Sequence, residues 1–217
     1  MKYLFYILTL SSLALSSKIS SAGEDFDANV HYFIHGKSIA PWELSLQFGQ
    51  VKLIDGKGKT TKGSLKAAKA TKQTSGDAIK FTWTPKGVMN EWNIADKNVH
   101  TLTLTNTKQY LNLLPVVDTA ALVIDLKLLK APRKHVDITM ECNWDWKCRS
   151  SLPLKNILKN LPTNEWVSLP IPLKCFDNGK LDYSQITSVM QLYSSDKLTL
   201  EINNIRLAAI TGNELKC

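Results

Sequence analysis

Short strand-like segments follow one another along most of the chain, and this pattern limits the available folds more than any other feature. The segments are rich in β-branched, aromatic and leucine residues, and several alternate apolar with polar side chains, as strands with one buried face do. Turn residues such as Asp55-Gly56 separate them. We therefore expect an all-β fold. The predicted strands cover residues 42–48, 50–53, 79–84, 98–105, 121–130, 135–142, 165–173, 186–193 and 197–207.

One segment has the spacing of an amphipathic helix. Its apolar residues fall on one face of a helix over residues 154–161, and Pro162 ends it. The sequence contains no internal repeat and no linker-like stretch. We therefore expect residues 23–217 to form a single domain, a two-sheet β-sandwich with one short helix.

The first 22 residues have the pattern of a secretory signal peptide. Lys2 precedes an apolar run that ends near Leu15, and a serine-rich stretch then leads to Ala22, after which we expect cleavage. The apolar run is too short to span a bilayer comfortably, and no second run of about twenty apolar residues follows. We expect an exported protein, periplasmic or extracellular, without a transmembrane segment.

The chain is basic, with a formal net charge of +8, and removal of Lys2 and Lys18 with the signal peptide leaves +6. Residues 56–73 contain six lysines and no acid. This segment is interpreted first as a solvated loop or edge-strand face and second as a contact for an anionic surface or an acidic polysaccharide. Nucleic acid is not an expected partner, because the chain has no basic helix and no recognisable nucleic-acid module.

The four cysteines fit an oxidising compartment. Cys142 and Cys148 lie six positions apart and are the natural disulfide pair. Closing so small a loop is worth roughly 2 kcal/mol in the chain-entropy model, enough to fix a loop. Cys175 lies in an apolar strand context that suits a buried thiol, and Cys217 is the last residue. Their spacing leaves open whether they pair.

The sequence lacks the motifs of most catalytic chemistries. The four histidines fall in separate segments, no G-x-S-x-G elbow is present, and "DGKGKTT" lacks the first glycine of a phosphate loop. No pair of carboxylates is held in a geometry that glycoside hydrolysis requires. Enzymatic activity and an organic cofactor are therefore not expected. A structural Ca²⁺ is a weaker expectation that depends on oxygens from Asp25, Asp27 and Glu201.

The segment "ECNWDWKC" contains the first candidate binding site. Trp144 and Trp146 lie two positions apart among Asn143, Asp145 and Lys147. If this loop is extended, side chains two apart project to the same side and form a paired aromatic platform for a sugar ring. The polar neighbours would then hydrogen-bond sugar hydroxyls. The alternative is that one tryptophan covers an end of the sandwich while the other lies on the loop.

The other tryptophans divide into two groups. Trp42, Trp83 and Trp166 have apolar neighbours in strand-like segments, and we expect them in the core, since a tryptophan buries a large area. Trp92 lies in the polar stretch "MNEWNIADKN" and is a further candidate for ligand contact.

The order of several segments resembles a known family. They are "APWELSL" (40–46), "SLKAAKATKQTSGDAIKFTW" (64–83), "ALVIDLKLLKAPRKHVDITMECNWDWKC" (121–148), "SLPLKNILKNLPTNEWVSLPIPLKCF" (151–176) and "KLTLEINNIRLA" (197–208). Together they resemble the C-terminal galactose-binding-like domain of ExoP-type exo-β-glucanases, multidomain bacterial enzymes of glycoside hydrolase family 3. The resemblance covers about residues 40–209.

The resemblance implies a jelly-roll sandwich that normally follows a catalytic domain, and it supplies no catalytic residue to this chain. The loop between Cys142 and Cys148 departs from the short, glycine-rich loop of the family. The leading hypothesis is a secreted, non-catalytic module that binds a β-glucan or a related polysaccharide. The alternative is a protein-interaction module that docks on a separately encoded hydrolase or an envelope protein. A small glycoside hydrolase is the third and least favoured hypothesis.

Overall fold

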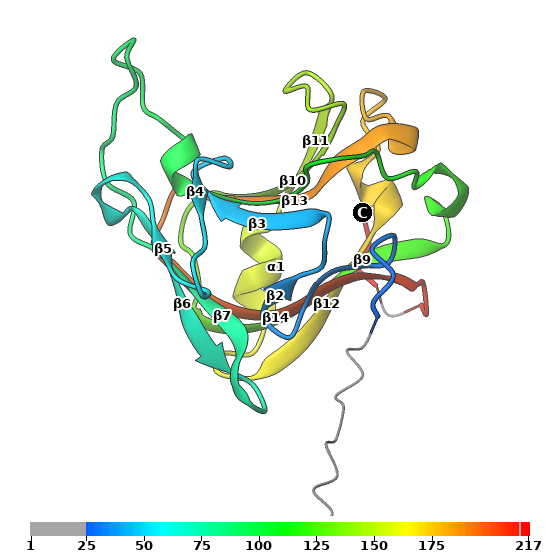
Figure 1. Cartoon of the computed structure of the whole chain (residues 1–217), viewed down its shortest axis with the longest axis horizontal. Helices are drawn as coiled ribbons and strands as arrows, with labels where there is room; N and C mark the ends of the chain where they lie inside the picture. Colours follow the sequence, from blue (N-terminus) through cyan, green and yellow to red (C-terminus); the bar gives the residue numbers. More distant parts are fainter. Residues whose placement is uncertain (1–24, 213) are drawn as a thin grey trace, which may run out of the picture.

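Two antiparallel sheets face each other across one hydrophobic core (Figure 1). The computed structural model describes residues 25–212 and 214–217, so the predicted signal peptide lies outside the described residues. The strand order is β12-β9-β14-β7-β6-β5 in the first sheet, here called sheet A, where β1 also pairs with β14 and β2 with β1. The order in the second, sheet B, is β11-β10-β13-β8-β3-β4. The predicted all-β sandwich is confirmed.

Sheet A contains eight strands. They are β1 His31–Ile34, β2 Lys37–Ser38, β5 Gly58–Lys59, β6 Leu65–Thr71, β7 Ser75–Trp83, β9 Ala120–Lys130, β12 Trp166–Pro172 and β14 Leu198–Ala209. Sheet B contains six. They are β3 Trp42–Leu46, β4 Val51–Lys52, β8 Thr101–Asn106, β10 Val136–Cys142, β11 Arg149–Pro153 and β13 Ile186–Ser194.

The described helices are short, and none is long and apolar enough to cross a membrane. The α-helix α1 spans Lys155–Asn160, close to the predicted 154–161, and packs Leu154 and Leu158 against the core. The predicted strand 98–105 is wrong over residues 98–100, which form a 3-10 turn, and β8 begins at Thr101. The 3-10 segments are η1 Thr61–Gly63, η2 Asn98–His100, η3 Leu114–Val116, η4 Leu173–Phe176 and η5 Tyr183–Gln185.

The core tests the predictions made for three tryptophans. Trp42 and Trp83 are buried in it, as expected. The prediction for Trp166 is wrong, because this residue pairs with Lys127 in register on the outer face of sheet A. The ammonium groups of Lys72 and Lys127 lie over its partly exposed ring, 5.4 and 5.2 Å from the ring centroid. Because side chains alternate along a strand, the residue next to Trp166 in β12 faces the core and Trp166 itself faces outward.

The lysine-rich segment runs through η1, β5 and β6, and β5 is an edge strand of sheet A. Its lysines are exposed except Lys72, which is partly covered. The structure therefore matches the interpretation as an edge-strand face. Within the segment, Lys69 pairs with the Asp55 carboxylate at 2.5 Å.

Both disulfides are formed. Cys142–Cys148 closes the turn between β10 and β11, as predicted. Cys175 is bonded to Cys217, so the suggestion of a buried thiol at Cys175 is wrong. The second bond closes a loop with a sequence separation of 42, worth about 4 kcal/mol in the chain-entropy model. It holds the C-terminal residues near β12, where the Leu215 amide donates to the carbonyl of Pro170 at 3.3 Å.

A buried carboxylate joins three strands of sheet A. Asp125 on β9 accepts hydrogen bonds from Ser168 on β12 (2.6 Å) and from Asn204 and Arg206 on β14 (2.9 and 2.6 Å). Burial by itself raises the pKa of Asp125, but the three donors and the Arg206 charge outweigh it and hold the pKa below its ordinary value. The ionised form therefore stabilises the fold.

We expect Asp125→Asn to lower the free energy of unfolding at neutral pH by about 1–3 kcal/mol, the usual value for hydrogen bonds to a charged group. Because the folded pKa is depressed, this stabilisation is present above the unfolded value of about 4 and is lost as the pH falls through the folded value. Urea unfolding at a series of pH values tests this. The two proteins should converge in acid. Asp118 is exposed and has no ion pair among the described residues, so Asp118→Asn should follow the wild type. A constant difference at all pH values would contradict the assignment.

Candidate functional site on the outer face of sheet B

A continuous row of polar side chains crosses all six strands of sheet B. The strand registers place these residues opposite one another in turn, and each alternates with a core residue of its own strand. The row spans five strand spacings, about 24 Å. From β4 to β11 it consists of Lys52, Ser45, Thr103, Gln191, Thr139 and Ser151.

Hydroxyl pairs fix parts of this row. The Oγ atoms of Ser45 and Thr103 lie 2.8 Å apart, and those of Thr139 and Ser151 lie 2.7 Å apart. Each pair links neighbouring strands and holds its hydroxyl groups in place. The row therefore holds hydrogen-bonding groups in fixed positions at the floor of this face, where Ser45, Thr103 and Gln191 are only 3%, 2% and 4% exposed.

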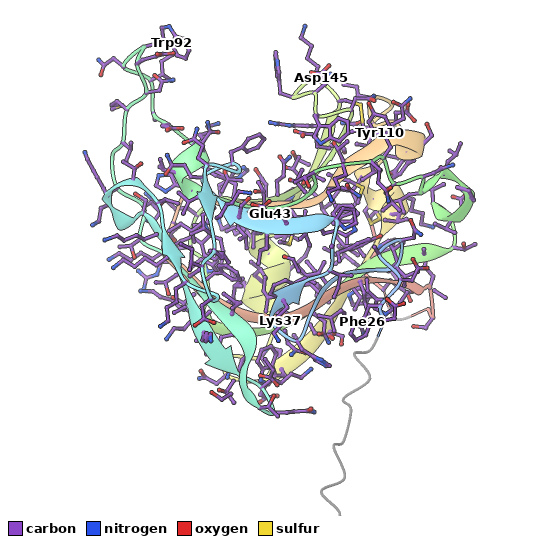
Figure 2. All side chains as sticks on the ribbon, in the orientation of Figure 1. Phe26, Lys37, Glu43, Trp92, Tyr110 and Asp145 are labelled. Carbon is purple, nitrogen blue, oxygen red and sulfur yellow. A yellow bond between two sulfur atoms is a disulfide. The ribbon has the colours of Figure 1, made fainter. Side chains whose placement is uncertain are left out.

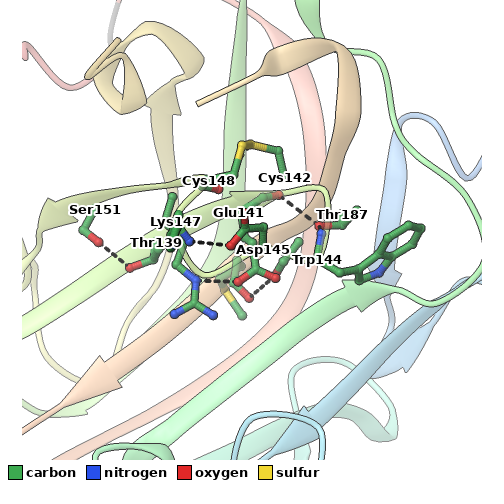
Figure 3. Close-up of polar contacts among 12 residues, drawn as sticks. Thr139, Glu141, Cys142, Trp144, Asp145, Lys147, Cys148, Ser151 and Thr187 are labelled. Carbon is green, nitrogen blue, oxygen red and sulfur yellow. Dashed lines mark hydrogen bonds and ion pairs between the residues drawn. A yellow bond between two sulfur atoms is a disulfide. The ribbon is translucent and has the colours of Figure 1, made fainter. Parts of the chain in front are cut away.

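Ion pairs flank this row of six polar residues, here called the central row, on both sides. Glu43 pairs with Lys52 at 3.1 Å, Asp137 with His135 at 2.5 Å, and Glu141 with Arg149. Figure 3 shows Glu141, the partner of Arg149, close to the loop that carries Trp144. Every carboxylate of this face thus lies next to a basic group, which does not favour its use as a free acid or base. Among the described residues there is also no group of three His, Cys, Asp or Glu side chains that could hold a metal ion.

The outer face of sheet B is hollowed in two places. One hollow, of about 360 Å³, lies over β3, β8 and part of β10, where Ser45, Thr103 and Glu141 line it. The other, of about 350 Å³, lies over β10, β11 and β13, where Thr139 and Ser151 line it. We refer to the two hollows together as the sheet-B groove.

Phe48 and Arg149 meet over the middle of the groove. Phe48 lies in the turn between β3 and β4, at a positive φ of 54°. The Arg149 guanidinium, from β11 at the opposite edge of the sheet, lies 4.6 Å from the centroid of its ring. Phe48 and Gln191 line both hollows. The contact is therefore a strap that divides one polar face into two compartments.

Tyr193 adds a neutral phenol to the second hollow. It lies on β13 in register with Asp137. Burial, and next the nearby Asp137 charge, raise the pKa of Tyr193 above its ordinary value. The phenol therefore keeps its proton at neutral pH and can both donate and accept a hydrogen bond.

The loop between the paired cysteines is not extended. Asn143 and Trp144 have positive φ angles of 58° and 50°, and the segment forms turns. The condition for a paired aromatic platform is therefore not met. Trp144 instead lies over Tyr110, with ring centroids 4.8 Å apart, and its indole N–H donates to the carbonyl of Asn106 at 3.0 Å. Its ring, 46% exposed, lines the first hollow of the groove.

The other residues predicted for this loop lie outside both hollows. Trp146 is 70% exposed, with the Lys147 ammonium 5.6 Å from its ring centroid. Asp145 accepts from the Lys147 amide at 2.9 Å, and the Asn143 amide donates to the carbonyl of Gln185 at 3.0 Å. These contacts shape the turn. Ligand contact by these four residues stays a prediction.

Trp92 lies at the end of a separate projecting loop (Figure 2). Asn90 organises this loop, since its side-chain oxygen accepts from the amides of Trp92 and Ile94, both at 3.0 Å. Met89, Trp92 and Ile94 are 58%, 71% and 62% exposed. Trp92 lines neither hollow, so the structure does not bring it together with Trp144.

The residues proposed for calcium have other partners. The Asp27 side chain accepts from the amide of Asn29 at 2.9 Å, and Glu201 pairs with Lys127 at 2.6 Å on the outer face of sheet A. Asp25 is exposed near the start of the described chain. A calcium site made by these three residues stays a prediction.

The chain was compared with known proteins. The family model for galactose-binding domain-like C-terminal domains, Exop_C, matches residues 40–207. The chain belongs to this family. No curated protein matches the Exop_C chain described here.

Solved structures share the fold of this Exop_C domain. The extra C-terminal domain (X) of exo-1,3/1,4-β-glucanase ExoP from a Pseudoalteromonas species is 16% identical, with a TM-score of 0.59, over 86% of this chain and 96% of that one. The whole ExoP enzyme is 17% identical, with a TM-score of 0.61, over 86% of this chain and 21% of the enzyme. The family 30 carbohydrate-binding module of a Clostridium thermocellum cellulosomal cellulase is 14% identical, with a TM-score of 0.53, over 82% and 96%.

Sequence reasoning missed the central row, although a signal for it existed. The stretch "HTLTLT" places Thr101, Thr103 and Thr105 at alternate positions, and "HVDITMEC" does the same for Asp137 and Thr139. Those patterns identify outward-facing residues of each strand. They do not say which strands are neighbours, and only that knowledge aligns the residues into one face.

Trp144→Ala and Trp146→Ala should differ in their effect on stability. The first removes a hydrogen bond and an aromatic contact, so the free energy of unfolding should fall by about 1–3 kcal/mol. The second removes a mostly exposed ring and should change stability by less than about 0.5 kcal/mol. Urea unfolding of both variants measures this. Equal losses would show that Trp146 packs as Trp144 does, contrary to the structure.

Proposed function

We propose that the protein is a secreted, non-catalytic carbohydrate-binding domain and that the sheet-B groove is its binding site. The observation that carries this proposal is the row of hydroxyl and amide groups from Ser45 to Ser151 across five of the six strands. A sugar chain offers many hydroxyl groups along its length, and a row of fixed donors and acceptors is complementary to it. Trp144 and Tyr193 at the margins offer aromatic surface for the C–H faces of sugar rings.

The comparisons support the ligand class that we propose. One structural neighbour is named as a carbohydrate-binding module, and another is a domain of an enzyme named as an exo-1,3/1,4-β-glucanase. We therefore propose a β-glucan or a related polysaccharide as the ligand. The two disulfides support an oxidising compartment, the periplasm or the cell exterior.

A second candidate function is docking on a separate protein, such as a hydrolase or an envelope protein. It is favoured by the projecting loop that exposes Met89, Trp92 and Ile94. Three large apolar side chains at one projecting tip are unusual on a surface that meets only water. The two functions use different parts of the molecule, so variants can separate them.

Affinity electrophoresis against β-1,3-glucan, β-1,4-glucan, xylan and galactan tests the carbohydrate proposal. Thr139→Val with Gln191→Met keeps side-chain size and removes hydrogen-bonding groups from the central row. We expect the double variant to bind at least about tenfold more weakly, since each lost hydrogen bond is worth about 1 kcal/mol.

The matched control is Trp92→Ala with Trp146→Ala, which removes the two most exposed tryptophans but leaves the groove intact. It should be retarded like the wild type. Loss of retardation in this control alone would show that the binding site lies on the loops that carry Trp92 and Trp146. No retardation of the wild type on any polysaccharide would contradict the proposal and favour a protein partner.

Phe48→Ala should change how affinity depends on the length of the sugar chain. In the wild type, the Phe48–Arg149 strap keeps a ligand from crossing between the two hollows, so affinity for neutral glucans should stop rising at a short oligosaccharide. Without the ring the hollows join, and affinity should continue to rise with chain length. Isothermal titration with glucan oligosaccharides of increasing length measures this.

Arg149→Lys provides a milder form of the same change, because lysine keeps a positive charge beside Glu141 and loses the planar group that stacks on Phe48. It should shift the length dependence in the same direction. An unchanged length dependence in both variants would show that the strap does not limit the ligand.

A further inference from the structure

A larger cavity adjoins the sheet-B groove at the β4 edge. Its volume is about 560 Å³, and its walls come from β1, β2, β3 and the loops that follow β4 and β8. In Figure 2, Glu43 on β3 and Lys37 on β2 mark opposite sides of this region. Lys52 and Lys108 also line it, and we call it the lysine cavity.

The lysine cavity has an excess of positive charge. Of its three lysines, Lys52 is paired with Glu43 at 3.1 Å. The nearby Asp55 carboxylate is paired with Lys69 at 2.5 Å. Lys37 and Lys108 make no ion pair with any carboxylate of the described residues. Two ammonium groups thus border one cavity without a compensating acid, and a bound anion would supply the missing charge.

The interior of the cavity is apolar. Phe33, Trp42 and Leu53 line it, and the indole N–H of Trp42 is already used in a 2.8 Å hydrogen bond to the carbonyl of Ala28. Phe33 and Trp42 are only 2% and 3% exposed, so most of the apolar surface that these three side chains offer comes from the partly exposed Leu53. A ligand that fits must combine an anionic group for the rim with a C–H face for the interior, and a sugar ring that bears a carboxylate or a sulfate has both.

The cavity is continuous with the groove. Glu43, Lys52 and Thr107 line both this cavity and the first hollow of the groove. A ligand on the central row that extends past β4 therefore meets the lysines next. The geometry points to an anion subsite in which Lys37 and Lys108 bind the carboxylate or sulfate of an acidic sugar unit, with the neighbouring units on the sheet-B groove. Only the placement of the neighbouring sugar units on the sheet-B groove rests on the proposed function; the anion subsite itself does not.

Residue-resolved titration tests the subsite. Amide spectra of the ¹⁵N-labelled mature protein are recorded with trigalacturonate as the carboxylate probe, a κ-carrageenan tetrasaccharide as the sulfate probe, and neutral cellotriose. Gly36, Gly56 and the Trp42 indole report on the lysine cavity, and Gly49 and Gln191 report on the groove. We expect at least one acidic probe to shift the cavity signals, and cellotriose to shift those of the groove alone.

Two charge-matched double variants complete the test. Lys37→Ala with Lys108→Ala should weaken the acidic probe about tenfold or more and leave cellotriose unaffected, since hydrogen bonds to charged groups are the stronger kind. Lys159→Ala with Lys180→Ala removes the same charge at exposed positions elsewhere and should change neither. High salt should weaken the acidic probe only. Comparison of the protein's affinities for the carboxylate probe and the sulfate probe identifies the preferred anion.

The outcomes separate this inference from the proposed function. If cellotriose shifts the groove signals while neither acidic probe shifts the cavity signals, the subsite is wrong and the proposed function stands. If an acidic probe shifts the cavity signals and no sugar shifts those of the groove, the subsite stands and the groove assignment is wrong. Equal weakening by the two lysine variants would also overturn the subsite, because general charge would then explain it.

Discussion

The register of sheet B is the constraint on which the candidate site depends. Leu44, Leu102 and Met190 fill the core from successive strands, and their neighbours must point outward because side chains alternate along a strand. A shift of one strand by one residue would expose its apolar side chains and bury its polar ones. The energy of the core therefore holds Thr103 and Gln191 in line on the outer face. The site is a consequence of packing on the opposite side of the same strands.

The two faces of the sandwich have different chemistry. On sheet A, the polar groups satisfy one another, as Asp125 does with its three donors and Lys127 with Glu201. On sheet B, the polar groups line hollows, and Phe48 and Arg149 span the space above them. The hydroxyl pairs of sheet B also bond to each other, but two hollows lie over them, and a hollowed face can accept a ligand. This difference is why we assign binding to sheet B.

Most of the fold was predictable. Besides the short strands β1 and β2, three strands were missed for a common reason. Long strands with apolar alternation, such as β9 and β14, were found nearly to their ends because burial dictates their composition. The edge strands β5 and β11 were missed, and so was β6, which lies next to β5. Their segments "GK", "LKAAKAT" and "RSSLP" carry lysine, alanine, serine or proline, which have weak strand preference. Edge strands bury less, so their sequences are less constrained.

The sequence by itself determined the sandwich, the family, the disulfide at the β10–β11 turn and the absence of common catalytic motifs. Each of these depends on residues close together, on a pattern along a single strand, or on the order of segments along the chain. Only the tertiary structure decided which tryptophans meet a hollow, that Cys175 bonds Cys217, and that six polar residues from six strands form one row. The physical reason is that strand order brings together residues far apart in the chain. Alternation tells which side of a strand faces out, but not which strand lies beside it.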